Sequence, residues 1–239
     1  MIFISLDYSP WSEKARWSLD YSGLQYTPKT YVSMVGAPWL RYKTRQYNGP
    51  VTVPALIDGK TVLKDSFDIA LYANSKRLDQ ARTDLFPCKQ VAQEWNKLSE
   101  KALSIGRHLC VERQLGNKPA QIEILPPFIP QKIRLYFTWL ARNGLQYHLD
   151  KYKVESPDLS RFRDILLKLR EQLNGRETIL DEFSYCDIAM SLTLQYVKPV
   201  AHKYSAQGPA SAKCWSTSEL LNEFKDLIEW RDSLYQIYR

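Results

Sequence analysis

The sequence predicts an α/β domain followed by an all-helical domain. Strand and helix signals alternate through residues 1–77, whereas strand signals stop after Cys88 and helical patterns fill the rest of the chain. A polar, mixed stretch separates the two parts, so we expect domains at 1–78 and 89–239 joined by a linker at 79–88. A chain of 239 residues is long enough for two such domains.

The stretch after the first strand carries the strongest functional signal. Residues 2–6 form an apolar run that predicts a strand, and the helical pattern after it ends near Gly23. Ser9 suits the N-cap of that helix, and Pro10 suits its first position, where the missing N–H costs nothing. A helix N-terminus presents unpaired N–H groups and a positive dipole end, so a hydroxyl there can hold an anion such as a thiolate. The alternative is that Ser9 is only a helix cap.

Further α/β elements follow this helix. A second strand is expected over residues 26–31, and a short, irregular helix over residues 36–47. Residues 51–63 predict two short strands joined by a hairpin turn at Asp58-Gly59.

Three residues near this hairpin have both a structural and a functional interpretation. Pro54 stands at the start of the first hairpin strand, where a proline suits an edge position or a cis bond. Asp65 or Ser66 can cap a third helix, and acidic residues in its first turn suit the helix dipole. The alternative for each is a purely structural role, as a strand-edge proline or a helix cap.

The second half of the chain is expected to be almost entirely helical. The patterns predict longer helices at residues 89–113, 131–151, 158–174 (led by Ser156-Pro157) and about 217–237. The residues of the second of these helices expected to face inward are Ile133, Phe137, Leu140, Gly144 and Tyr147. Residues 184–187 have the pattern of a capping box, with Asp187 in the place usually taken by Glu.

Composition and charge exclude several classes of function. The net charge of +7 is spread along the chain without a basic block, so no nucleic-acid partner is expected. The four cysteines and three histidines are too scattered for a metal site or a redox pair. The sequence shows no signal-peptide pattern, and no apolar run is long enough to span a membrane. We therefore expect a cytoplasmic protein with no metal and no membrane insertion.

Four short motifs carry a family resemblance. In chain order they are Ser9-Pro10-Trp11, Val53-Pro54, Asp65-Ser66 and the capping-box segment 183–188. With the change from α/β to all-helical patterns, they make the whole chain resemble a cytosolic glutathione transferase of the Ser type. The resemblance implies a thioredoxin-like, glutathione-binding N-terminal domain and an all-helical C-terminal domain.

The resemblance implies a role for each motif in binding glutathione. Ser9 matches the hydroxyl that donates a hydrogen bond to the glutathione sulfur and favours its thiolate form. Val53 matches the residue whose backbone pairs with the cysteine residue of glutathione, and Pro54 matches the cis proline that turns this backbone outward. Asp65 and Ser66 match the pair that holds the γ-glutamyl end.

Some assignments stay open at this point. Tyr8 and Ser12 are competing hydroxyls next to Ser9. Asp65 stands where the family usually has Glu, and its shorter side chain reaches less far toward an amine. For the glycyl end, the nearby cations are Lys43 and Arg45. The resemblance also implies that residues of the regions 102–113 and 202–215 line the second-substrate site.

The expected function is that of a glutathione transferase. Such an enzyme conjugates glutathione, its co-substrate, to small electrophilic apolar compounds and serves detoxification, and the resemblance implies a homodimer. Because Ser9 replaces the cysteine of thiol-using relatives, a mixed disulfide with the protein is not expected. One alternative is a non-catalytic protein or regulatory subunit that binds glutathione or an apolar ligand. A weaker alternative is a glutathione peroxidase side activity.

Overall fold

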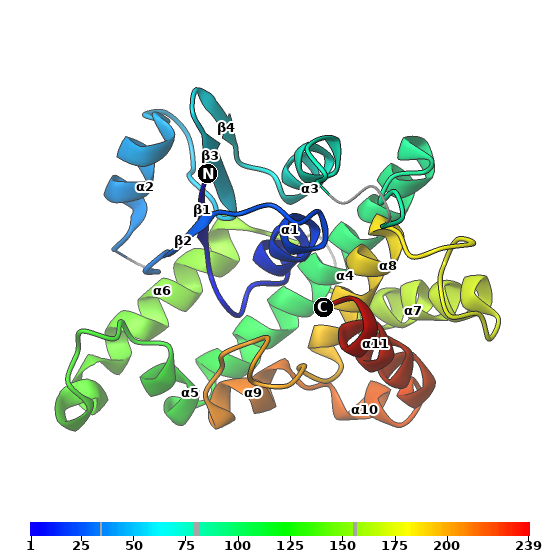
Figure 1. Ribbon diagram of the computed structural model, residues 1–239. Helices are drawn as coiled ribbons and strands as arrows, with labels where there is room; N and C mark the ends of the chain where they lie inside the picture. Colours follow the sequence, from blue (N-terminus) through cyan, green and yellow to red (C-terminus); the bar gives the residue numbers. More distant parts are fainter. Residues whose placement is uncertain (34, 79–81, 155–156) are drawn as a thin grey trace.

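The computed structural model describes residues 1–33, 35–78, 82–154 and 157–239. It begins with a four-stranded sheet in the order β2-β1-β3-β4 (Figure 1). The central strand β1 (Ile2–Ser5) runs parallel to β2 (Thr27–Thr30) and antiparallel to β3 (Ala55–Asp58), and β3 pairs antiparallel with β4 (Thr61–Leu63). This is the mixed sheet that the predicted strand order requires.

Three helices cover the two faces of this sheet. Helices α1 (Pro10–Tyr21) and α3 (Ser66–Ser75) pack together on one side, and α2 (Ala37–Thr44) lies on the other (Figure 1). Neighbouring residues of β1 point to opposite faces, so Phe3 packs in the cluster under α1 and α3, while Ile4 packs with Leu40 of α2. The predicted order of strands and helices is therefore confirmed.

The remainder of the described chain is helical. Its elements are α4 (Lys89–Leu115), α5 (Lys118–Glu123), η1 (Gln131–Phe137), α6 (Thr138–Lys151), α7 (Leu159–Leu173), α8 (Tyr185–Ser191), η2 (Leu192–Tyr196), α9 (Pro209–Trp215), α10 (Ser218–Leu221) and α11 (Lys225–Tyr238), where η marks a 3-10 helix. The change from an α/β to an all-helical part confirms the predicted fold class. Of the predicted linker, residues 79–81 lie outside the described part of the chain, and residues 82–88 form neither a helix nor a strand.

The capping box predicted at residues 184–187 is confirmed. Both reciprocal bonds of the capping box at the start of α8 are present. The fully buried Asp187 carboxylate accepts the backbone N–H groups of Ile179 at 2.7 Å and Ser184 at 2.9 Å. Helix α7 begins after Asp158, whose side chain accepts the backbone N–H of Ser160, and Ser156 lies outside the described residues.

The predicted inward face of the helix at 131–151 is wrong in part. Its first two turns form η1, which has about three residues per turn, so an apolar stripe spaced for an α-helix does not continue across the junction. Ile133 and Tyr147 are 41% and 66% exposed, whereas Ala141 and Leu145 are the buried residues of α6. The predicted last helix also differs, because it is divided into α10 and α11. Helices α5 and α9 are not among the predicted elements.

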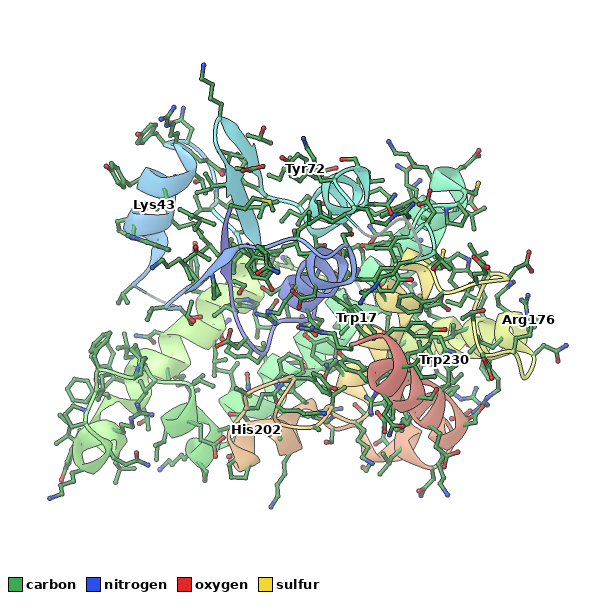
Figure 2. All side chains as sticks on the ribbon, in the orientation of Figure 1. Trp17, Lys43, Tyr72, Arg176, His202 and Trp230 are labelled. Carbon is green, nitrogen blue, oxygen red and sulfur yellow. The ribbon has the colours of Figure 1, made fainter. Side chains whose placement is uncertain are left out.

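Hydrogen bonds and ion pairs join the C-terminal end of α11 to α1. Trp17, near the centre of the molecule in Figure 2, donates its indole N–H to the Tyr238 carbonyl at 3.0 Å. The guanidinium of Arg239 binds the carboxylates of Glu13 and Asp20, each at 2.7 Å, and Glu13 also pairs with Arg16 at 2.6 Å. These contacts explain why the C-terminal end of α11 lies beside α1 in Figure 1.

Candidate functional site

Ser9 lies where the chain turns from β1 into α1. Its extended backbone and its side chain make it the N-cap of α1, because Oγ accepts the backbone N–H of Ser12 at 3.4 Å. The side chain is half-buried. In this bond the Ser9 hydroxyl is the acceptor, so its own proton remains to be donated to a ligand.

The two competing hydroxyls differ in their surroundings. Ser12 is fully buried, and its Oγ accepts the backbone N–H of Leu6 at 3.1 Å, so it holds the turn after β1 and does not reach a ligand. The Tyr8 hydroxyl lies 3.4 Å from Ser33 Oγ. Burial raises the pKa of Tyr8, which keeps the phenol protonated and able to donate. Ser9 and Tyr8 therefore remain as donors.

Val53 and Pro54 immediately precede β3. The Val53-Pro54 peptide bond is cis, as predicted. Lys151, at the end of α6, donates from Nζ to the Val51 carbonyl at 3.1 Å. The segment before β3 is therefore held by a side chain of the helical part.

Asp65 and Ser66 lie at the N-terminus of α3. Asp65 is the N-cap, and its Oδ1 accepts the backbone N–H groups of Phe67 at 2.8 Å and Asp68 at 3.2 Å. Within the described residues, no hydrogen bond uses the second carboxylate oxygen of this exposed side chain. That oxygen can accept a hydrogen bond from a ligand amine. Ser66 is buried and lies close to the phenol of Tyr185.

A polar network that the sequence analysis missed joins α1 to α4 and α8. The fully buried Lys14 donates from Nζ to Glu100 at 2.7 Å and to Asn96 Oδ1 at 3.2 Å. Trp11 donates its indole N–H to Glu100 at 2.6 Å, and Tyr185 donates to Asn96 at 2.8 Å. Burial lowers the pKa of Lys14, and the Glu100 carboxylate opposes that change.

One sequence signal points to this network. Lys14 falls on the same helical stripe as Trp17 and Tyr21, both of which are buried. A cation on a buried stripe needs a polar partner, because an unpaired buried charge is very costly. The spacing does not say which residue supplies the partner.

A second group that the sequence analysis missed surrounds Arg107 of α4. Its guanidinium carbon lies 4.7 Å from the ring centre of Trp11 and 4.1 Å from that of Tyr152, both within cation–π range. The ring of His148 packs against Tyr152 at 4.8 Å. Burial lowers the pKa of Arg107. The pKa of His148 falls to about 4, mainly through burial and then through Arg107 and Lys151.

Parts of both regions expected to face the second substrate lie near Tyr8. Trp215 meets Tyr8 edge-on at 6.3 Å and stacks on Tyr196 at 4.5 Å. Gly106 of α4 packs so closely against Tyr196 that a Cβ there would overlap the ring. Helix α9 therefore lies beside Tyr8 through Trp215, and α4 lies behind it across the ring of Tyr196.

Lys43 and Arg45, the cations suggested for the glycyl end, are both exposed. Lys43 lies on α2 at the outer edge of the molecule (Figure 2), with its ammonium 5.8 Å from the ring centre of Tyr42. Arg45 follows the end of α2 in a left-handed conformation, with φ of 53°. Neither forms an ion pair within the described ranges, and their role stays a prediction.

Comparison with protein families gives one match. Residues 8–76 match the family described as "Glutathione S-transferase, N-terminal domain". No curated protein matches the chain in sequence.

Comparison with solved structures gives many matches. A rice glutathione S-transferase in complex with glutathione is 13% identical, with a TM-score of 0.58 over 99% of this chain and 87% of its own. Glutathione transferase Xi 1 from Trametes versicolor is 16% identical, with a TM-score of 0.61 over 98% and 78%. A glutathione S-transferase from Methylobacterium radiotolerans, in complex with glutathione sulfonate, is 17% identical, with a TM-score of 0.58 over 99% and 90%. These likenesses show a shared fold.

Two searches of the described residues bear on other kinds of site. They contain no group of three or more His, Cys, Asp or Glu side chains that could hold a metal ion. Among the helices of the same residues, none combines the length and apolar character needed to cross a membrane.

Proposed function

Since residues 8–76 match the glutathione S-transferase N-terminal domain family and the whole chain has the glutathione transferase fold, we propose that this protein is a glutathione transferase. It conjugates glutathione to small electrophilic apolar compounds through a thiolate that Ser9 stabilises. The observation that supports this most directly is the Ser9 hydroxyl at the N-terminus of α1, with its proton left to donate.

The chemistry follows from the difference between a thiol and a thiolate. A free thiol has a pKa of about 8.5, so only a few per cent is nucleophilic at neutral pH. A hydrogen bond from Ser9 and the positive end of the α1 dipole both favour the charged form. Lowering the thiol pKa by about two units makes most of the bound glutathione a thiolate at neutral pH.

The remaining site residues hold the peptide in this proposal. The Val53 backbone, presented by the cis Pro54, pairs with the cysteine residue of glutathione. Ser66 and the N–H groups at the start of α3 bind the γ-glutamyl carboxylate, since a helix N-terminus attracts anions. The unused carboxylate oxygen of Asp65 accepts the ammonium group.

The test is the ultraviolet absorbance of the bound glutathione thiolate as a function of pH. We expect a depressed thiol pKa in the wild type and a rise toward the free value in Ser9→Gly, which keeps only the contribution of the helix dipole. Glycine is chosen because it removes the hydroxyl and still suits an N-cap: a Ser-to-Gly change there lowers helix stability by only a few tenths of a kcal/mol. Ser9→Thr, which keeps a hydroxyl, should preserve the thiolate. If Tyr8→Phe abolishes the signal while Ser9→Gly does not, Tyr8 is the donor.

The proposal includes further features that the resemblance implied. Residues 1–78 form the glutathione-binding domain and residues 89–239 the helical domain. The protein acts in the cytoplasm, as a homodimer, in detoxification. Sedimentation equilibrium of the purified chain tests the dimer, and a monomer at all concentrations would refute it.

One observation favours a second candidate function, a glutathione- or ligand-binding protein without turnover. Ser66 is only 3% exposed, and Asp65 already caps α3 with one carboxylate oxygen, so both residues have a structural role that does not require turnover. Binding of glutathione without any thiolate absorbance, in both the wild type and Ser9→Gly, is the result expected for such a protein.

A further inference from the structure

Arg107 is a partly buried cation without a polar partner among the described residues. It is half-buried on α4, and two aromatic rings, those of Trp11 and Tyr152, contact its guanidinium. No hydrogen bond or ion pair joins Arg107 to any described residue. Burial lowers the pKa of its guanidinium. The desolvation of this guanidinium is therefore only partly offset.

The geometry of these contacts leaves the donors free. Both contacts of the guanidinium are with aromatic rings, so its five N–H groups have no oxygen acceptor among the described residues. None of the Arg107 nitrogens is among the buried side-chain atoms that lack a partner, which is consistent with donors that solvent can reach. A planar fork of donors, held from rotating by two rings, suits a carboxylate bound through two hydrogen bonds.

The charges nearby are mostly positive. The Glu100 carboxylate acts on Arg107 from a distance and raises its pKa, but its two oxygens are already used by Lys14 and Trp11. Burial, and then Arg107 and Lys151, lower the pKa of His148, so both cations lie close enough to act on that ring. An anion bound beside Arg107 would be attracted by both of these cations.

The position of Arg107 points to the side of the second substrate. Trp11, which it contacts, lies in the first turn of α1, two residues after Ser9. Gly106, its neighbour in sequence, packs against Tyr196, which stacks on Trp215 beside Tyr8. By contrast, the residues assigned to the peptide backbone and the γ-glutamyl end of glutathione lie just before β3 and at the start of α3.

We propose that Arg107 binds a carboxylate of the electrophilic substrate, so that this enzyme prefers anionic aromatic or apolar acids to their neutral analogues. The proposal rests on the glutathione transferase function proposed above. It narrows the substrate class from apolar electrophiles in general to electrophiles that carry an acid group. The aromatic rings of Trp11 and Tyr152 would pack against the apolar part of such a molecule.

The test uses a matched pair of electrophiles, 4-chloro-3-nitrobenzoate and 4-chloro-3-nitrobenzamide. In both, the glutathione thiolate forms a C–S bond at the ring carbon as the C–Cl bond breaks and chloride leaves with its electron pair. The variants are Arg107→Gln and, as a control, Arg142→Gln, an exposed arginine on α6. The measured quantity is the ratio of kcat/KM for the acid to that for the amide, in which intrinsic reactivity cancels between variants.

We expect Arg107→Gln to lower this ratio at least about tenfold, since a hydrogen bond to a charged group contributes roughly that much to affinity. Arg142→Gln should leave the ratio unchanged. An unchanged ratio in Arg107→Gln, with both substrates turned over, overturns the proposal. A separate arm compares the KM for glutathione with that for its glycyl monoester. If Arg107→Gln raises KM for glutathione alone, the bound carboxylate is the glycyl group, and the proposal is again overturned.

A binding measurement separates this proposal from the proposed function. The dissociation constants of the acid and the amide are measured by quenching of tryptophan fluorescence, without glutathione. If the protein shows no turnover but binds the acid more tightly than the amide, and Arg107→Gln removes that preference, the anion site stands and the enzyme function fails. If the preference is absent in the wild type, the anion site fails whatever the activity.

Discussion

The ammonium of Lys14 lies 2.7 Å from the Glu100 carboxylate, yet the Lys14 side chain is fully buried and that of Glu100 is 38% exposed. Loss of one partner of this ion pair should therefore destabilise the protein more than loss of the other. Without Glu100 the Lys14 charge has no counter-charge in the network, whereas without Lys14 the Glu100 carboxylate keeps the indole N–H of Trp11 and access to water.

This asymmetry predicts unequal effects of two substitutions. We expect Glu100→Gln to lower the free energy of unfolding by about 2–4 kcal/mol, somewhat less than for a fully buried pair because Glu100 is partly exposed. Lys14→Met should cost only about 1 kcal/mol, since it removes the buried charge and keeps an apolar stem. Urea unfolding measures both.

The exposed pair Lys225–Glu229, 3.7 Å apart on α11, provides a control. Lys225→Met should change the free energy of unfolding by less than about 0.5 kcal/mol. Glu100→Gln in the Lys14→Met background should then cost much less than in the wild type. Equal costs in the two backgrounds would contradict the asymmetry.

The lowered pKa of His148 predicts a pH-dependent stability. In the unfolded chain the imidazole binds a proton near pH 6.5, but in the folded protein only near pH 4. Between these values the unfolded state takes up a proton that the folded state refuses, so stability falls as pH falls from 6.5 to 4. The loss is at most about 3 kcal/mol.

Urea unfolding of wild type and His148→Gln between pH 4 and 7 measures this effect. The difference between the two curves isolates His148 from other titrating groups, such as Asp187, whose pKa burial raises to about 6. His202→Gln, at an exposed position, serves as the matched control. Parallel curves for wild type and His148→Gln would show that His148 does not cause the pH dependence.

Asp65 should recognise the amine of glutathione by its charge. Asp65→Asn keeps a good N-cap for α3 but removes the negative charge. We expect it to weaken glutathione binding about tenfold, as for the loss of a charge-assisted hydrogen bond. Calorimetric titration with glutathione and with glutaryl-cysteinyl-glycine, which lacks the amine, measures the effect. A similar loss for both ligands would assign Asp65 a structural role only.

The close contact between Gly106 and Tyr196 predicts a cost for adding one methyl group. Gly106→Ala should lower the free energy of unfolding by about 1–3 kcal/mol, because the new Cβ overlaps the Tyr196 ring in a well-packed core. Gly116→Ala, at the end of the same helix, meets only an ordinary contact at 3.7 Å and should be tolerated. In the Tyr196→Leu background, Gly106→Ala should lower the free energy of unfolding by less. Thermal unfolding of Gly106→Ala, Gly116→Ala, Tyr196→Leu and the double variant measures these differences.

The sequence predicted those features that local rules determine. The Ser9 cap and the capping box at Asp187 each depend on residues a few positions apart. The cis bond before Pro54 was implied by the family resemblance, because local rules also allow a strand edge or a strand start there. The partners of Lys14 are 82 and 86 positions away, so no local spacing reveals them. The contact of Arg107 with Trp11 was also not predictable from local spacing, because it depends on how α4 packs against α1.

The failure in the region of α6 has a different cause. An apolar stripe can be read only if the period is known, and the change from three residues per turn in η1 to 3.6 in α6 shifts the buried face. Residues such as Tyr147 then point outward, although their spacing suits a continuous helix.

The ion pairs of Glu13 with Arg16 and Arg239 have a consequence for synthesis of the chain. Glu13 is almost completely buried, and its partner Arg239 lies 226 positions further along. The ribosome releases α1 and the whole sheet long before it adds α11, at about 5–20 residues per second. During that interval Arg16 is the ion-pair partner of Glu13 that has already been made, and the surface of α1 that α11 later covers is exposed to solvent. The helix that carries Ser9 therefore reaches its final surroundings only when translation has reached the last helix.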